Sequence, residues 1–210
     1  ASSRKIISFF AEQLADRRKN PREGDFISEL TQAEVEGQKV PDQYILGVCN
    51  LMLVAGVDTT WSAIGSTLWH LAQHPEHRQQ LRDNPEMWPT AIEELLRVYA
   101  PVTMARIVDR DTEFEGCPMK AGDRVLMTFP AANRDPRQFD DPDVVKLDRE
   151  HNRHVAFGSG IHRCAGSNLA RLELRVALQT WLERIPEYSL VDPSDVTWAG
   201  GQVRGPRRCL

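Results

Sequence analysis

The stretch that most limits how this chain can fold is the loop FGSGIHRCAG at residues 157–166, with a long apolar run directly behind it. The loop places Cys164 among Gly158, Gly160 and Gly166, just before a predicted helix. The free N–H groups and the positive dipole end of a helix N-terminus stabilise a thiolate. Glycine permits backbone conformations and close approaches that side chains forbid. A bulky, flat partner can therefore lie against this loop.

Two ordinary alternatives exist for this thiol. A buried structural cysteine is the commonest state of any single cysteine. Zinc binding is the other alternative, although the spacing H-x2-H-x7-H-x-C matches none of the usual zinc-finger patterns. Its ligands would be His151, His154, His162 and Cys164.

Composition and charge exclude several classes of protein. Of the 210 residues, 41% are hydrophobic and 27% charged, which is typical of a soluble globular protein. The net charge of -4 provides no basic field for nucleic acid or an anionic membrane surface. The cysteines form no C-x-x-C pair and no disulfide framework, so we expect a reducing cytoplasm; they are Cys49, Cys117, Cys164 and Cys209.

Periodicity predicts a mainly helical chain with small β-sheets. We expect helices over residues 4–19, from near 41 to about 73, in a short stretch after 74, from about 89 to 99, and over 165–185. The last has apolar residues on most of its sides and should lie deep in the core. Short strands are expected within residues 104–129, loops up to about 163, and a strand or hairpin in the tail.

The longest apolar stretch lies at residues 45–57 and ends at Asp58. A membrane-spanning helix needs about 20 apolar residues. The stretch therefore predicts a buried helix, not a membrane span. The helix predicted over residues 4–19 begins almost at the first residue of the chain, which suggests truncation at the N-terminus.

The pattern Phe157-x-x-Gly160-x-x-x-Cys164-x-Gly166 resembles the haem-binding signature of the cytochrome P450 monooxygenases, and HVAFGSGIHRCAGSNLARLE resembles their soluble bacterial branch. The resemblance implies that Cys164 is the thiolate ligand of the iron of haem b. It runs over residues 1–210 but corresponds to the C-terminal half of the family's chain, from about helix G onward. It thus implies one partial domain with a long distal helix, an E-x-x-R helix, β-hairpins, the cysteine loop and a buried helix after it.

The segment AGVDTT at residues 55–60 is a poor sequence for a helix interior, because Asp and Thr prefer local side-chain hydrogen bonds. The Thr59 hydroxyl can bond back to the Ala55 carbonyl beside Gly56, which predicts a kink. The resemblance makes this segment the oxygen-binding groove of the distal helix. It implies that Ala55 and Gly56 lie against haem, and that Asp58 and Thr59 deliver protons.

Glu94 and Arg97 match the family's E-x-x-R pair, but periodicity assigns them another place. The apolar stripe of their helix is formed by Ile92, Leu95, Leu96 and Tyr99. The pair points away from that stripe, which predicts a solvated face. Only the resemblance implies a buried ion-pair network, completed by Arg149 or, alternatively, by Arg134.

The resemblance implies further contacts. Arg106 and His162 would anchor the haem carboxylates, and Phe157, Gly158, Gly160 and Gly166 would lie against the haem. Substrate contacts would come from Leu51, Val54, Ala55, Val102, Thr103, Met104, Gln202 and Val203. These are mostly apolar, which favours a hydrophobic organic substrate. Separately, His70, His74 and His77 have the spacing H-x3-H-x2-H, which is compatible with metal binding. We expect these three histidines to be surface and short-helix residues without a metal.

The implied function is that of a haem-thiolate monooxygenase that inserts one oxygen atom of O2 into its substrate. No stretch resembles a flavin or nicotinamide domain, so the electrons would come from a separate ferredoxin-type or flavin-containing donor. It would dock near the cysteine loop, where Arg163, Arg171 and Arg175 add positive charge. The alternative is a non-catalytic haem-binding or structural fragment that associates with itself, because the absent half would leave apolar surface exposed.

Overall fold

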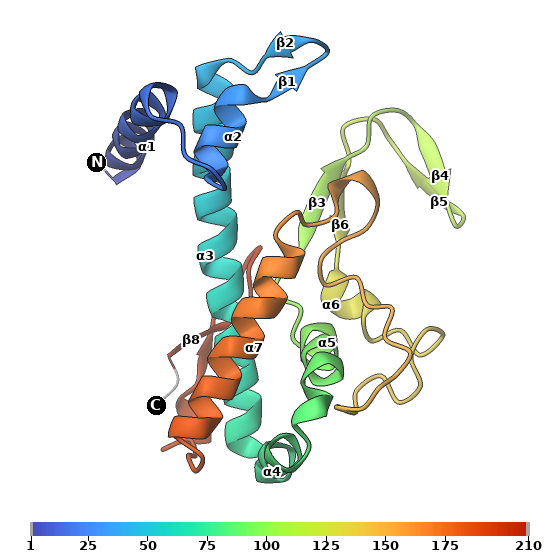
Figure 1. Cartoon of the computed structure of the whole chain (residues 1–210). Helices are drawn as coiled ribbons and strands as arrows, with labels where there is room; N and C mark the ends of the chain where they lie inside the picture. The colour runs from blue at the N-terminus through green and yellow to red at the C-terminus, as the bar shows by residue number, and fades with distance from the viewer. Residues whose placement is uncertain (1, 209–210) are drawn as a thin grey trace. The chain divides into compact units, whose positions relative to one another are not determined.

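The computed structural model describes residues 2–208, which form a mainly helical chain with small antiparallel sheets, as predicted (Figure 1). The helices are α1 Ser2–Lys19, α2 Phe26–Gln32, α3 Asp42–Gln73, α4 Pro75–Asp83, α5 Trp88–Val98, α6 Phe129–Ala132 and α7 Ser167–Arg184. Single 3-10 turns are η1 Pro85–Met87, η2 Gly160–His162 and η3 Pro193–Asp195. The chain divides into two compact units, Ala1–Val57 and Asp58–Leu210.

The first unit has a small core of its own. Leu14 of α1 packs with Ile45 and Cys49 of α3, and Leu30 of α2 is one of the half-buried side chains around them. The Asp25 carboxylate caps α2 by accepting a hydrogen bond from the Ser28 backbone N–H at 2.8 Å. The sequence prediction missed α2 and the hairpin of β1 Glu34–Val35 and β2 Gln38–Lys39, because such short elements carry almost no periodicity.

Helix α3 has the predicted length but not the predicted burial. By length and composition it is the one helix within residues 2–208 that is apolar enough to cross a membrane, and 17% of its most apolar window is buried. Its exposed apolar side chains include Leu51, Met52, Leu53, Val54 and Val57. The prediction of a buried helix over residues 45–57 is therefore wrong for residues 51–57, whereas Ile45 and Cys49 of the same stretch are buried. An apolar run favours burial, but burial requires a second segment that packs on it.

The second unit is built around α5, which lies beside α7 although the two are far apart in sequence (Figure 1). Leu174 and Leu178 of α7 belong to the same core as Leu95 of α5 and Leu71 of α3. Helix α7 is less buried than expected, because it buries one stripe while Leu172 and other apolar residues stay about half exposed. Helix α7 has apolar residues on several sides, and the described part of the chain packs against only one of those sides.

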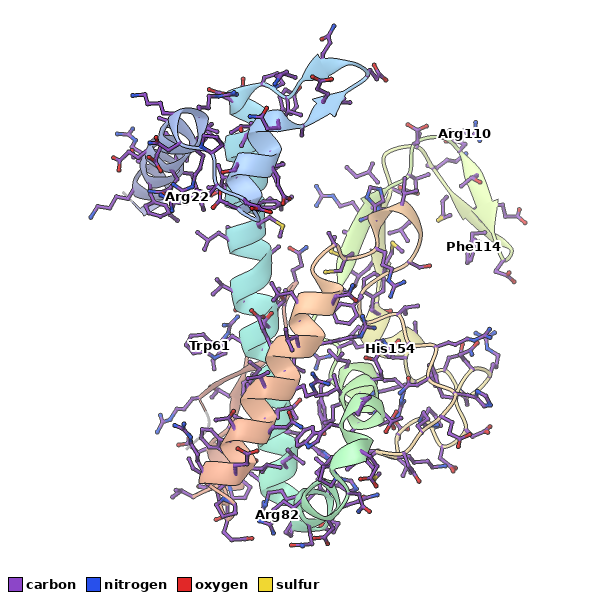
Figure 2. The ribbon with its side chains drawn as sticks, viewed as in Figure 1. Arg22, Trp61, Arg82, Arg110, Phe114 and His154 are labelled. Atoms are coloured by element: carbon purple, nitrogen blue, oxygen red, sulfur yellow. The ribbon has the colours of Figure 1, made fainter. Side chains whose placement is uncertain are left out.

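The strands of the second unit form three two-stranded antiparallel sheets within the described residues. They are β3 Met104–Ile107 with β6 Arg124–Met127, β4 Thr112–Phe114 with β5 Cys117–Met119, and β7 Thr197–Trp198 with β8 Pro206–Arg208. The predicted strands are confirmed, whereas β5 was missed because Pro118 interrupts its pattern. Glu115 and Gly116, both at positive φ, turn the β4–β5 hairpin, whose Phe114 is exposed (Figure 2).

Candidate functional site

The cysteine loop is folded back on itself just before α7. The Cys164 backbone N–H donates to the Phe157 carbonyl at 2.9 Å, and the Arg163 N–H donates to the Gly160 carbonyl at 3.0 Å. Gly158 and Gly160 both have a φ of 70°, in the left-handed region that favours glycine. The sequence thus forms this loop because two of its three glycines supply the turns that close it.

The Cys164 thiol is free and exposed, whereas the buried free cysteine is Cys49. The structural-cysteine alternative for Cys164 is therefore wrong. A Cβ added at Gly160 would meet nothing within 4 Å, and one at Gly166 would lie 3.9 Å from the Cys164 sulfur. The thiol is therefore accessible, and the residue beside the sulfur, Gly166, carries no side chain. Zinc binding by His151, His154, His162 and Cys164 gains no support among the described residues, because these four do not form a group of possible metal ligands and His154 Nε2 is bound to Glu93.

The loop is fastened to α5 and α7 by a half-buried carboxylate. Glu93 of α5 lies 3.0 Å from His154 Nε2 and 2.6 Å from Arg171 Nε, and the Arg171 guanidinium covers the Phe157 ring at 4.6 Å. Burial raises the pKa of Glu93, but hydrogen bonds with His154 and Arg171 outweigh it and lower that pKa to about 2. Arg171 is therefore an internal partner, while Arg163 and Arg175 are exposed.

Glu94 and Arg97 are fully buried, so the prediction of a solvated face is wrong. The carboxylate and guanidinium are bidentate, with both N···O distances at 2.8 Å. Arg149 Nε lies 2.9 Å from Glu94 Oε2 and is the third member, whereas Arg134 pairs with Asp143. Burial raises the pKa of Glu94, but the hydrogen bond with Arg97 and its other partners lower it below the usual value.

The remaining donors of Arg97 are satisfied by backbone carbonyls. It donates to the carbonyls of Asn133, Pro142 and Val144 at 2.8, 2.6 and 3.1 Å. Periodicity missed this burial because the loop at residues 133–149 covers the polar side of α5. The network therefore ties α5 to the long segment that leads to the cysteine loop.

Asp58 is paired with a residue that the sequence analysis did not single out. Arg207 of β8 donates to both carboxylate oxygens of Asp58, at 2.8 and 3.2 Å. The hydrogen bond from Arg207 lowers the pKa of Asp58 below its ordinary value. Both side chains are partly exposed. The basic tail was the only sequence signal for Arg207, and it does not indicate a partner 149 residues away. Thr59, the next residue of α3, is half-buried.

The turn at Val102–Met104 and the segment Gln202–Val203 are brought together. Val102 and Val203 form a β-bridge, and the Thr103 N–H donates to the Gln202 carbonyl at 2.9 Å. Two of the predicted substrate segments therefore lie side by side. The other members, Leu51, Val54 and Ala55, lie on α3 within the first unit together with Gly56.

The basic residues predicted to hold haem carboxylates are both exposed. Arg106 lies on β3 and donates to the Ala105 carbonyl at 2.9 Å. His162 ends the turn η2 in the cysteine loop. Both side chains are available to an anionic ligand on the surface of the second unit.

Comparison with known proteins identifies the relatives of this chain. A sequence profile of the family Cytochrome P450 matches residues 2–88 and 83–187. Probable cytochrome P450 127A1 of Sinorhizobium fredii is 40% identical over 205 residues, covering 98% of this chain and 49% of that protein. The polyketide biosynthesis cytochrome P450 PksS of Bacillus subtilis is 39% identical over 93% of this chain and 49% of its own length.

The solved structure of PksS superposes with a TM-score of 0.93 at 38% identity, over 98% of this chain and 54% of that one. This chain spans about half the length of the curated relatives it matches. Since the profile and relatives of about 40% identity extend over most of the sequence, the chain belongs to the cytochrome P450 family.

Proposed function

We propose that residues 1–210 are one partial domain, the C-terminal half of a bacterial haem-thiolate monooxygenase from about helix G onward, and that Cys164 ligates the haem iron. The family in general holds haem through a cysteine thiolate. The observation that carries the assignment is the exposed Cys164 thiol, which lies in a glycine-rich loop with Gly166 beside the sulfur. Haem b is large, flat and mostly apolar, so this loop fits it.

The bound haem supplies the chemistry that activates O2 and inserts one oxygen atom into the substrate. The chain would hold the cofactor through Cys164, and Phe157 and the glycines of the loop would lie against it. The exposed Arg106 guanidinium would bind a haem carboxylate by a charge-assisted hydrogen bond, and the exposed His162 imidazole would donate a hydrogen bond to the haem carboxylates. The family resemblance implies that Ala55 and Gly56 of α3 would also lie against the haem, since a small side chain and a glycine leave space for it.

Two residues in the middle of α3, Asp58 and Thr59, deliver protons for the reaction. The Thr59 hydroxyl holds the proton, and the Asp58 carboxylate exchanges it with solvent. Arg207 orients Asp58 and keeps it ionised, so the Asp58–Arg207 pair must open before Asp58 takes up a proton. Arg207 therefore acts as a positioning residue for this step.

The substrate is a hydrophobic organic molecule. Its contacts would be Leu51, Val54 and Ala55 of α3 with Val102, Thr103, Met104, Gln202 and Val203, which are mostly apolar. PksS is named for polyketide biosynthesis, and the mostly apolar lining suits a hydrophobic organic substrate in general.

Electrons come from a separate ferredoxin-type or flavin-containing protein in the cytoplasm. The exposed Arg163 lies in the cysteine loop and the exposed Arg175 lies on α7, and their charge complements an acidic donor. Arg171 is omitted from this surface because it is bound to Glu93. The free thiols of Cys49, Cys117 and Cys164 suit a reducing compartment.

The test is the absorption spectrum of the haem-loaded, reduced protein with carbon monoxide bound. Cys164→Ser should abolish the thiolate-type spectrum, whereas the same change at Cys49, Cys117 or Cys209 should leave it intact. Cys209 lies outside the described residues. Loss of the spectrum in one of the other three variants, or its persistence in Cys164→Ser, would reject the loop assignment.

The second candidate is a non-catalytic, self-associating fragment. It is favoured by apolar side chains that stay exposed in the second unit, among them Trp61, Leu169, Leu172 and Val176. We therefore expect little or no hydroxylation by residues 1–210 alone and a concentration-dependent increase in mass by light scattering. A stable monomer that hydroxylates substrate with coupled electron use would contradict this expectation.

A further inference from the structure

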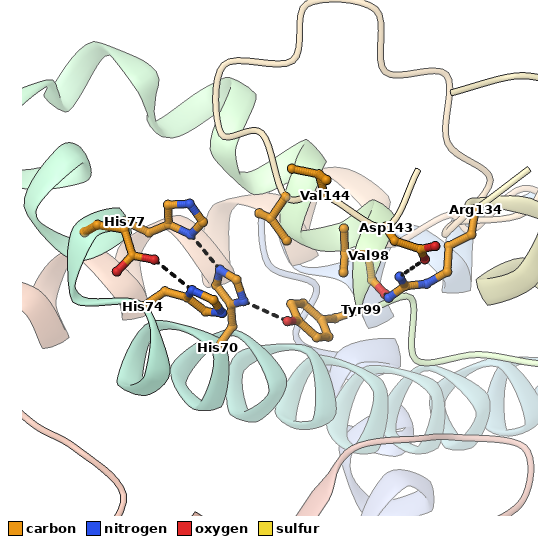
Figure 3. Close-up of a pocket in the computed structure, with 10 residues that line it drawn as sticks. His70, His74, His77, Val98, Tyr99, Arg134, Asp143 and Val144 are labelled. Carbon is orange, nitrogen blue, oxygen red and sulfur yellow. Dashed lines mark hydrogen bonds and ion pairs between the residues drawn. The ribbon is translucent and has the colours of Figure 1, made fainter. Parts of the chain in front are cut away.

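Three histidines gather at the corner between α3 and α4, away from the cysteine loop in sequence (Figure 3). The His70 and His74 rings stack with centroids 4.3 Å apart, and the His77 ring lies 5.1 and 5.2 Å from them. His70 lies in the last turn of α3, His74 is the N-cap residue of α4, and His77 lies in the first turn of α4. The tight corner at Pro75 thus turns all three rings toward one place.

His74, Glu76 and His77 lie close enough together for one metal ion to be shared among them. One ligand atom from each lies within 4.8 Å of the other two. His74 Nδ1 is 2.8 Å from Glu76 Oε1. Tetrahedral ligands about 2.0 to 2.1 Å from a zinc ion lie roughly 3.3 Å apart, so small side-chain rotations suffice to close the set.

A buried partner orients one of these ligands. His70 is 2% exposed, and its Nε2 lies 2.9 Å from His77 Nδ1. On its other side, His70 Nδ1 lies 2.7 Å from the Tyr99 hydroxyl, as Figure 3 shows. Metal-binding histidines usually have their second ring nitrogen held in this way, which fixes the ring and its tautomer. The contact leaves Nε2 of His77 as the coordinating atom.

We propose that His74, Glu76 and His77 bind a divalent transition-metal ion of the zinc type. Two imidazoles and one carboxylate are a borderline donor set that favours Zn²⁺ over Mg²⁺ or Ca²⁺. A cavity of about 410 Å³, lined by these residues with Val98, Tyr99 and Asp143, provides room for a water molecule as the fourth ligand. The ion would fasten the end of α3 to the first turn of α4. This site is independent of haem binding.

The experiment is a zinc titration of the untagged, metal-stripped chain against a chromogenic chelator, with exposed thiols alkylated beforehand so that Cys117 and Cys164 do not compete. We expect one saturable site per chain. His74→Ala and His77→Ala should each weaken it at least tenfold. These substitutions should not unfold the chain, because His74 is 43% exposed and His77 half-buried.

Three further variants separate ligation from folding. Glu76→Gln keeps the side-chain volume at an exposed position and should also weaken zinc binding at least tenfold. His70→Asn removes the orienting contact and should weaken it roughly 10- to 100-fold. His151→Ala, at an exposed histidine outside the cluster, should leave the affinity unchanged. Far-UV circular dichroism checks the fold of each variant.

A second metal identifies the donors. Co²⁺ in place of zinc should give visible absorption bands of a tetrahedral nitrogen and oxygen site, without thiolate charge-transfer bands. The proposal is overturned if the chain with its cluster unmutated binds no zinc at a ratio of one ion per chain. It is also overturned if the His74→Ala, His77→Ala double variant binds zinc with unchanged affinity. Failure here would leave the spectrum of the Cys164 site unaffected.

Discussion

Replacing Glu94 with Gln should be among the most destabilising conservative changes in this chain. The carboxylate accepts five hydrogen bonds, from Arg97 Nε and Nη2, the Lys146 N–H, Arg149 Nε and Asn152 Nδ2, at 2.8 to 3.0 Å. Glutamine keeps one oxygen, so its NH2 group would face two donors in the place of Oε1 or three in the place of Oε2, and the guanidiniums would lose their counter-charge. Removing one partner of a buried ion pair costs about 3 to 5 kcal/mol.

The free energy of unfolding is measured by urea denaturation, followed by tryptophan fluorescence and circular dichroism. A loss of this size should lower the denaturation midpoint by about 1 to 2 M urea. The chain supplies its own control, because Glu150 and Arg153 repeat the E-x-x-R spacing at exposed positions. Glu150→Gln should change the stability by no more than about 0.5 kcal/mol. If the two variants differed by less than about 1 kcal/mol, the network would not carry the stability assigned to it.

Three other outcomes are expected. In a complete, reconstituted enzyme, Thr59→Ala should divert electrons to hydrogen peroxide, whereas Thr59→Ser should keep them coupled to product. Coupling is measured as product formed per electron pair consumed. Equal coupling in the two variants would mean that the Thr59 hydroxyl has no role in proton delivery. Gly205→Ala would place its Cβ 2.5 Å from Ser62 and should cost about 1 to 3 kcal/mol by urea denaturation, whereas Gly200→Ala meets nothing within 4 Å; equal costs would contradict the close approach. Glu93, with its pKa lowered to about 2, should stabilise the fold above pH 4.5 by about 3 kcal/mol at most, and this is lost as the pH falls toward 2; a wild-type advantage over Glu93→Gln that did not shrink across that window would refute it.

Local patterns in the sequence were sufficient for the elements that depend on neighbours along the chain. The long helices α3, α5 and α7 follow from a 3.6-residue apolar period and from proline and glycine at their ends. The cysteine loop follows from its own glycines, which close hydrogen bonds between residues less than ten positions apart. The family resemblance rests on the same loop and extends over the chain.

Tertiary structure alone decided which polar groups are buried and which partners they have. Periodicity assigned Glu94 and Arg97 to solvent, and the chain buries them under a loop that supplies Arg149. Asp58 and Arg207 are 149 residues apart, and no sequence period connects them. The opposite error occurs at residues 51–57, whose apolar side chains were predicted to be buried but are exposed in the described chain. A side chain's burial and ion pairing depend on what packs against it, and distant segments of the chain supply that surface only once the backbone has folded.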